Sequence, residues 1–329
     1  MSAARAMRVA VLDDYQQAAL QCADWSVLND AAQIEVFHDH LFDADALVQR
    51  LLPFDVVCLM RERTPMPAAI IKRLPNLKLI VTTGHWNAAI DLDCARARGI
   101  TVCGTTSIRT PTAGLTWMFI FALARQLPAQ LQSMRSGGWQ VDLGLDVQGM
   151  TLGLLGLGSL GSRVARQAQA FDMKVLAWSQ NLTDEHARSV GAQRVDKDEL
   201  LAHSDFVSIH LILSARTRHL IGAREVALMK PGAFLINTSR GPIVDEAALV
   251  QALRERRIAG AGIDVFDPEP TPADHPLRHL DNAICTPHIG YVTQQGYRHF
   301  FPQVVDNIVQ WMAGEPVRLL EQHPAAGVR

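Results

Sequence analysis

Three side chains that can bind an anion or move a proton follow apolar segments in the second half of the chain. Arg240 is followed by Gly241-Pro242, so a turn would orient its guanidinium, which can hold a carboxylate through two parallel N–H donors. Glu269 lies between two prolines, which stiffen its loop. His288 follows a proline at the end of another apolar segment, and a histidine changes its charge near neutral pH. Together these groups could bind a carboxylate and exchange a proton beside it.

Each of these side chains also has an ordinary structural interpretation. An arginine commonly forms a surface salt bridge, a loop glutamate is usually solvated, and a histidine at a strand end is about as often a hydrogen-bonded core residue. Their joint occurrence at successive strand ends of one predicted sheet favours a functional site, because ligands collect at the carboxyl ends of parallel strands.

A glycine motif, Gly156–Gly161, stands between a predicted buried strand and a predicted helix. The helix is indicated by apolar residues at helical spacing, which are Leu160, Val164, Ala168 and Phe171. In this setting the first glycine permits a tight turn, the second lets backbone approach a pyrophosphate, and the third lets helix pack on strand. The helix N-terminus adds N–H donors and the positive end of a dipole. The motif predicts a dinucleotide site, with a glycine-rich turn of an α/β protein as the alternative.

Size and composition exclude several classes of protein. The 329 residues exceed one comfortable hydrophobic core, which predicts two domains. Apolar residues make up 48% and charged residues 19% of the chain, as is typical of a soluble globular protein. A formal net charge of -2 gives no electrostatic basis for binding a nucleic acid or an anionic membrane surface. We therefore expect a small-molecule partner, no nucleic acid and no membrane.

The cysteines and the N-terminal segment indicate a cytoplasmic protein without a metal site. The 5 cysteines are widely spaced and include no C-x-x-C pair, which favours buried thiols over disulfides or a zinc site. The first apolar segment, residues 9–12, is too short for the core of a signal peptide and is predicted as a strand. The most apolar segment, residues 115–124, covers about half a membrane span and is predicted as a buried helix.

Short apolar segments alternate with helical patterns over the first hundred residues, which predicts a doubly wound parallel sheet of the flavodoxin-like kind. The predicted strands are Arg8–Leu12, Ile34–Phe37, Asp55–Met60, Leu77–Thr83 and Ile100–Cys103. The predicted helices are Gln16–Asn29, Ala44–Leu52, Pro67–Arg73 and Asp91–Arg98. Arg61 and the Gly84-His85 loop each follow a predicted strand, where such sheets bind ligands.

A second α/β unit follows a long apolar helix predicted over residues 112–127. Its predicted strands are Thr151–Leu155, Lys174–Trp178, Phe206–Leu213, Ala233–Thr238, Gly260–Val265 and Ala283–Thr286. A last helix, roughly residues 299–312, would return to the first domain. We therefore expect a discontinuous substrate domain of residues 1–106 and 289–329, and a Rossmann-type dinucleotide-binding domain of residues 107–288.

Taken in order, these motifs resemble those of the D-isomer-specific 2-hydroxyacid dehydrogenases, the family of phosphoglycerate and D-lactate dehydrogenases and glyoxylate/hydroxypyruvate reductases. The matching segments are Gly156–Gly161, Asn237-Thr238-Ser239-Arg240-Gly241, Gly262-Ile263-Asp264-Val265-Phe266 with Glu269-Pro270, and Thr286-Pro287-His288-Ile289-Gly290. The similarity runs from about Arg8 to Ala313. It implies an α/β enzyme of two doubly wound parallel-sheet domains. Such an enzyme transfers a hydride between a nicotinamide cofactor and a D-2-hydroxy acid/2-oxo acid pair.

The resemblance assigns roles to the three side chains introduced first. His288 would be the general acid and base, and Glu269 would orient its ring and favour its protonated form. Arg240 would bind the substrate carboxylate and polarise the keto group. On the substrate side, Arg61 matches an arginine of the family. Gly84-His85 matches the loop whose backbone amides hold the carboxylate.

The resemblance also implies a set of cofactor contacts. They are Gly156, Gly158, Ser159, Leu160, Gly161, Ser179, Thr238, Ser239, Asp264 and Gly290. The backbone N–H groups of Ser159 and Leu160 would bind the pyrophosphate, and Asp264 would lie on the nicotinamide carboxamide side. Thr238 and Ser239 would line the cofactor cleft.

The sequence departs from the family pattern at the adenosine end. A carboxylate that binds the ribose hydroxyls is expected directly after the second strand of the cofactor domain, where Ser179 stands, followed by Gln180. An aspartate there would repel a 2′-phosphate, and an arginine just after it would attract one. Neither is present, so we predict NAD(P) as the cofactor, with use of NADP and with NAD also accepted.

The substrate loop departs from the pattern as well. His85, Trp86 and Tyr291 stand where many relatives have smaller residues, which favours a small substrate such as glyoxylate or hydroxypyruvate. Packing of these side chains at the domain boundary is an equally good explanation. Gly114 replaces a glutamate that is common in the family, and we have no functional account of it.

Other functions agree with parts of the pattern. Dinucleotide-binding corepressors share the fold and can keep the three catalytic residues, although no extended disordered tail is expected here. Formate dehydrogenases carry a glutamine at the position of Glu269. An S-adenosylhomocysteine hydrolase is disfavoured by chain length and by the arginine, glutamate and histidine set. The family also implies a homodimer.

Overall fold

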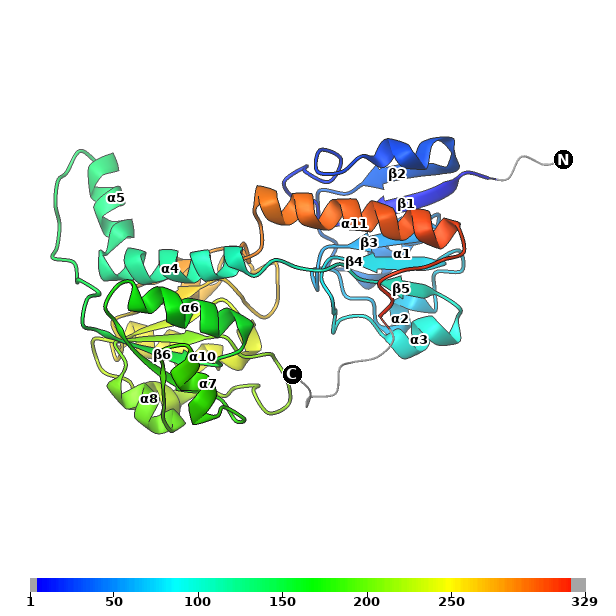
Figure 1. Cartoon of the computed structure of the whole chain (residues 1–329). Helices are drawn as coiled ribbons and strands as arrows, with labels where there is room; N and C mark the ends of the chain where they lie inside the picture. Colours follow the sequence, from blue (N-terminus) through cyan, green and yellow to red (C-terminus); the bar gives the residue numbers. More distant parts are fainter. Residues whose placement is uncertain (1–4, 321–329) are drawn as a thin grey trace. The chain divides into compact units, whose positions relative to one another are not determined.

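The computed structural model describes residues 5–320, without the side chains of residues 29 and 30, and divides into two compact units (Figure 1). The first unit ends at Ile108 and resumes at Thr293, and the second is Arg109–Val292. The first unit is therefore discontinuous.

The first unit is built on five parallel strands in the order β2-β1-β3-β4-β5. The strands are β1 (Met7–Val11), β2 (Ala32–Val36), β3 (Val56–Leu59), β4 (Leu79–Thr82) and β5 (Thr101–Cys103). This order is that of flavodoxin-like sheets, whose ligand sites lie where the order reverses, at the carboxyl ends of the strands. β3 and β4 are buried at every position, which explains their continuous apolar sequences.

Helices cover this sheet. They are α1 (Ala44–Leu51), α2 (Ala68–Ile71), α3 (Leu92–Ala97) and α11 (Gln294–Met312). Asp43 and Asp91 cap α1 and α3 with their carboxylates, as their positions before helical patterns suggest. α11 packs against β4 and buries Phe300, Val304 and Ile308 (Figure 1), so the last helix does return to the first unit.

The helix predicted over residues 16–29 is wrong. This segment forms turns and then the short 3-10 helix η1 (Trp25–Ala31). The Asp14 carboxylate accepts the N–H groups of Ala18 and Ala19, at 3.0 and 2.9 Å, and closes a turn. Trp25 then donates its Nε1–H to the Ala19 carbonyl at 2.9 Å. Side-chain bonds to the backbone thus replace the helical ones.

The second unit holds seven parallel strands in the order β12-β11-β10-β9-β6-β7-β8. They are β6 (Thr151–Leu155), β7 (Lys174–Trp178), β8 (Gln193–Arg194), β9 (Phe206–Ile209), β10 (Phe234–Asn237), β11 (Gly260–Ile263) and β12 (Ala283–Cys285). This is the Rossmann order extended by one strand, and it reverses between β6 and β9. The doubly wound architecture predicted for both units is confirmed, although β8 was not predicted.

Helices flank the second sheet on both faces (Figure 1). They are α4 (Thr110–Ala124), α5 (Leu127–Arg135), α6 (Ser159–Gln169), α7 (Asp184–Ser189), α8 (Lys197–His203), α9 (Ala223–Leu228) and α10 (Glu246–Arg254). α4 packs on β10 and β11, and Gly262 in β11 leaves room for the ring of Phe119. α5 was not predicted, and Figure 1 shows it standing away from the rest of its unit. Within residues 5–320, every helix is too short or too polar to cross a bilayer.

Candidate functional site

His288 and Glu269 form a close pair in the second unit. His288 Nδ1 lies 2.6 Å from Glu269 Oε2, and Glu269 Oε1 accepts the N–H of Phe266 at 2.8 Å. Both side chains are partly accessible, at 17% for His288 and 25% for Glu269. Because an ionised carboxylate can only accept, Nδ1 carries the proton of this bond and Nε2 is the ring atom left to exchange a proton with a ligand.

Asp264, at the end of β11, holds the turn on which His288 lies. Its Oδ1 accepts the Thr286 hydroxyl at 2.5 Å and the Ile289 N–H at 2.8 Å, and its Oδ2 accepts the Gly290 N–H at 2.8 Å. The turn needs this support because His288 adopts a φ of 51°, which is uncommon outside glycine. Burial raises the pKa of the Asp264 carboxyl, and the Thr286 bond and the charge of His288 oppose that shift. Sequence reasoning assigned Asp264 to the cofactor and missed this contact with the His288 turn.

Arg240 follows β10 in a turn held by Asn237. The Asn237 side chain donates to the Arg240 carbonyl at 3.0 Å and accepts the Ser239 N–H at 3.0 Å. Arg240 Nη1 itself donates to the Ser239 carbonyl at 2.8 Å. Gly241 lies directly on the backbone of Phe266, where any Cβ would collide. The Arg240 turn and the segment that holds Glu269 are thus in direct contact.

The glycine motif forms the connection from β6 to α6. Gly156 has a φ of 102° and faces the His210 carbonyl, and a Cβ at Gly161 would collide with the Gly156 carbonyl. A Cβ at Gly158 would meet no atom of the described residues within 4 Å. α6 begins at Ser159 with Gly158 at its N-cap, and no side chain within residues 5–320 caps it. Open space before an uncapped helix N-terminus is what a dinucleotide pyrophosphate requires, so these residues fit the cofactor.

The remaining predicted cofactor residues follow strands of the same sheet, and several have internal bonds. Ser179 follows β7 and is partly exposed. The Thr238 hydroxyl lies 3.2 Å from that of Thr116, and the Ser239 hydroxyl donates to the Leu211 carbonyl. The Gly290 carbonyl accepts the Thr112 hydroxyl at 2.9 Å.

Arg61 and Gly84 lie together in the first unit, after β3 and β4. The Arg61 N–H donates to Thr83 Oγ1 at 3.0 Å, and Asn87 donates to the Arg61 carbonyl at 2.7 Å. Gly84 has a φ of 102°, and a Cβ there would collide with the Arg61 guanidinium. The Gly84 N–H donates to Thr105 Oγ1 at 2.7 Å, so Gly84 supplies space for the arginine rather than a donor for a ligand. His85, which follows, is exposed.

Comparison with known proteins decides the family. Residues 117–290 match the sequence model described as "D-isomer specific 2-hydroxyacid dehydrogenase, NAD binding domain". A glyoxylate reductase of Korarchaeum cryptofilum is 35% identical over 296 residues, which are 88% of this chain and 86% of that protein. The chain belongs to the D-isomer-specific 2-hydroxyacid dehydrogenase family.

Solved structures of other family members resemble this dehydrogenase along most of the chain. A phosphoglycerate oxidoreductase from Vibrio cholerae has a TM-score of 0.89 and 34% identity, and the match covers 94% of this chain and 99% of that one. A D-lactate dehydrogenase from Aquifex aeolicus, solved with NAD and lactic acid, has a TM-score of 0.80 and 25% identity. That match covers 95% of this chain and 99% of the other.

Some supporting residues of this dehydrogenase carry no sequence signal. His186 of α7 reaches the glycine motif, where its Nε2 lies 2.8 Å from the Leu157 carbonyl and 3.3 Å from the Ser162 hydroxyl. Asn87 holds Arg61 from within the core. Neither residue stands in a motif or at a distinctive spacing, so their positions follow only from the folded chain.

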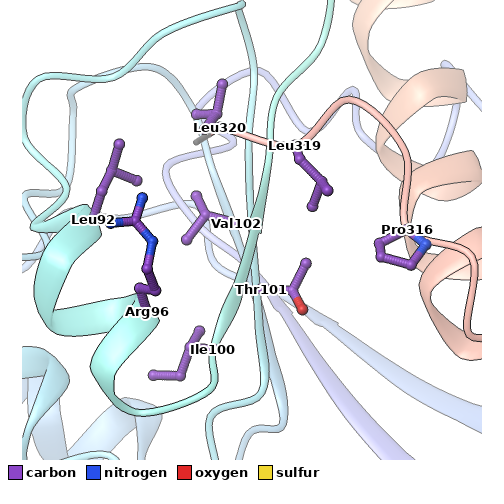
Figure 2. Close-up of a pocket in the computed structure, with 8 residues that line it drawn as sticks. All are labelled: Leu92, Arg96, Ile100, Thr101, Val102, Pro316, Leu319 and Leu320. Atoms are coloured by element: carbon purple, nitrogen blue, oxygen red, sulfur yellow. The ribbon is translucent and has the colours of Figure 1, made fainter. Parts of the chain in front are cut away.

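A pocket in the first unit contains none of the predicted site residues (Figure 2). Its volume is about 580 Å³, and its lining comes from α3, β5 and the segment after α11. That segment pairs with β5, since the Leu320 N–H donates to the Val102 carbonyl at 2.8 Å. Arg96, the charged residue of the lining, pairs with Asp93 at 3.1 Å.

Proposed function

We propose that this dehydrogenase reduces small 2-oxo acids to D-2-hydroxy acids, with His288 as the general acid and base. The observation that carries the proposal is the 2.6 Å bond between His288 Nδ1 and Glu269 Oε2. This bond leaves Nε2 for the reacting oxygen. The pair lies in the unit that carries the glycine motif, and Gly241 joins it to the Arg240 turn through Phe266.

We assign each side chain a separate role in the reaction. A bound nicotinamide cofactor supplies the hydride to the carbonyl carbon during reduction. His288 gives its Nε2 proton to the carbonyl oxygen, so the carbon gains the hydride and the oxygen gains the proton. The Glu269 carboxylate faces the imidazolium before this transfer and holds the ring in one orientation afterwards. Arg240 binds the substrate carboxylate and polarises the carbonyl.

We assign the substrate side of the first unit in the same way. Arg61 supplies a positive charge for a bound substrate, and the amide after Gly84, that of His85, supplies a donor. In the second unit the Tyr291 ring stands edge-on to the His288 ring, with centroids 5.4 Å apart. The bulk of His85, Trp86 and Tyr291 supports a small substrate such as glyoxylate or hydroxypyruvate.

A screen of 2-oxo acids tests this proposal. Oxidation of NADPH and NADH would be followed with glyoxylate, hydroxypyruvate, pyruvate, phenylpyruvate and longer 2-oxo acids. We expect the highest kcat/KM with glyoxylate or hydroxypyruvate and a decline with chain length. Turnover restricted to long or aromatic 2-oxo acids would contradict the substrate assignment. Cofactor binding without turnover of any 2-oxo acid would favour a cofactor-sensing interaction protein of the same fold.

We expect this dehydrogenase to use NADPH. Ser179 places no carboxylate where a 2′-phosphate would lie, so kcat/KM for NADPH should equal or exceed that for NADH. Ser179→Asp should lower kcat/KM for NADPH by about 10- to 100-fold through like-charge repulsion. The matched control is Ser179→Asn, which keeps a similar size without the charge. A strong preference of the unmodified enzyme for NADH would contradict the assignment.

We also propose a homodimer formed through an apolar arm, defined here as residues 127–145. On α5, Leu127, Leu131 and Met134 are exposed at helical spacing on one face. The segment after α5 exposes more apolar side chains, which are Trp139, Val141, Leu143 and Leu145. An exposed apolar surface of this kind marks an interaction site, and a second copy of the chain would cover it.

Leu131→Asp is expected to convert the dimer to a monomer at micromolar concentration, because a charge cannot be buried unpaired in an apolar interface. Sedimentation velocity measures the change. Gln132→Asp, a polar and exposed neighbour on α5, is the matched control and should stay dimeric. A Leu131→Asp protein with the mass of a dimer would rule out the arm as the interface.

We propose a cytoplasmic location for the enzyme. All five cysteines are free thiols, and burial raises the pKa of Cys103 to about 11. Unpaired thiols of low reactivity are typical of a reducing compartment.

A further inference from the structure

His275 and Glu246 form a close pair beside the loop that carries Glu269. His275 Nε2 lies 2.6 Å from Glu246 Oε1, and the side chains are 8% exposed for His275 and 38% exposed for Glu246. We propose that this pair positions Glu269 for the reaction by tying the Glu269 loop to the segment that follows Arg240. His275 and Glu246 are then positioning residues, and the inference rests on the proposed roles of Glu269 and His288.

Phe266 contacts both His275 and Glu269 and so links the two residues. The Phe266 ring packs edge-on against the His275 ring, with centroids 5.6 Å apart and an angle of 79° between the planes. The backbone N–H of the same residue donates to Glu269 Oε1 at 2.8 Å. A displacement of His275 would therefore release the residue that holds one oxygen of Glu269, while the other oxygen holds His288.

Glu246 lies at the start of the helix that follows the Arg240 turn. It is the first residue of α10, and the carboxylate of the preceding Asp245 caps the helix at the Ala248 N–H, at 3.2 Å. α10 follows Arg240 through the short 3-10 helix η2 (Gly241–Ile243), and Gly241 rests on the Phe266 backbone. The His275–Glu246 bond thus closes a ring of contacts that includes both the Arg240 turn and the Glu269 loop.

The chemistry of the pair favours positioning over stability. A pair with a solvent-accessible partner contributes little net stability, and the Glu246 side chain is 38% exposed. The His275 ring is buried, which fixes the histidine end of the bond. Misplacement of a reacting group by about 1 Å can cost about 100-fold in rate. A small movement of Glu269 is therefore enough to lower kcat while the fold persists.

The experiment compares His275→Ala with His275→Gln. We expect kcat of His275→Ala to fall about 10- to 100-fold, with KM for the 2-oxo acid and Kd for NADPH within about threefold of the unmodified enzyme. His275→Gln, whose amide N–H can still donate to Glu246, should recover most of kcat. The His275→Ala/Glu246→Ala double variant should be no slower than the slower single variant, because both changes break one contact.

The NMR signals of the His288 ring at a fixed pH give a second readout that does not need turnover. In His275→Ala these signals should shift, because the Glu269 carboxylate that contacts the ring has moved. In His279→Ala, an exposed histidine of the neighbouring 3-10 helix η3 (Pro276–His279), they should not shift. If the enzyme turned over no 2-oxo acid, the proposed function would fail, yet shifted His288 signals would still support the positioning role. Unchanged His288 signals and an unchanged kcat in His275→Ala, with only a lower Tm, would overturn the inference.

Discussion

Replacing His288 with alanine is expected to lower kcat for 2-oxo acid reduction by about 10²- to 10⁴-fold, the usual contribution of a general acid. The variant loses the Nε2 proton that the carbonyl oxygen receives, and water replaces it poorly. Asp264 bonds to the backbone N–H groups of Ile289 and Gly290 and to the Thr286 side chain, so the turn itself should persist. Steady-state kinetics at several pH values, together with the Kd for NADPH, measure the effect.

The controls for His288→Ala separate chemistry from binding. The Kd for NADPH should change little, because the glycine motif is untouched. His203→Ala, an exposed histidine in the same unit, should leave kcat unchanged. A kcat of His288→Ala close to that of the unmodified enzyme would remove His288 from the mechanism.

Replacing Arg240 with alanine is expected to lower kcat/KM for the 2-oxo acid by about 30- to 5,000-fold, since loss of a charge partner costs about 2–5 kcal/mol. Both parameters should change: KM rises because the carboxylate loses its partner, and kcat falls because the carbonyl is no longer polarised. Arg240→Lys keeps the charge without the two-donor geometry and should lie between alanine and the unmodified enzyme. Steady-state kinetics over a wide range of 2-oxo acid concentrations resolve the two parameters.

The outcome of this experiment also distinguishes binding from polarisation. A rise in KM with an unchanged kcat would limit Arg240 to holding the carboxylate. Arg256→Ala, which removes an exposed salt bridge with Asp281 in the same unit, is the matched control and should leave kcat and KM unchanged. An Arg240→Ala enzyme with unchanged kinetics would contradict the assignment.

The first two strands of the second unit followed their sequence pattern most closely. β6 and β7 begin and end where they were predicted, because each is a short apolar segment bounded by clear turn residues. The segment after β1 did not follow its pattern, since the Asp14 carboxylate closes a turn where apolar spacing predicted a helix. α5 was not predicted, and its apolar side chains are exposed rather than packed in a core.

The sequence by itself determined the fold class of both units, the glycine motif, and the identity of Arg240, Glu269 and His288 as the candidate site. These depend on local periodicity and on the chemistry of single side chains, both of which are visible along the chain. Only the tertiary structure decided which contacts hold these groups. Asp264 bonds to the turn that carries His288, Gly241 packs on the backbone of Phe266, and His275 bonds to Glu246. These contacts join residues 25 to 29 positions apart in sequence. Such pairs form through the packing of different strands and loops, which no short segment of sequence specifies.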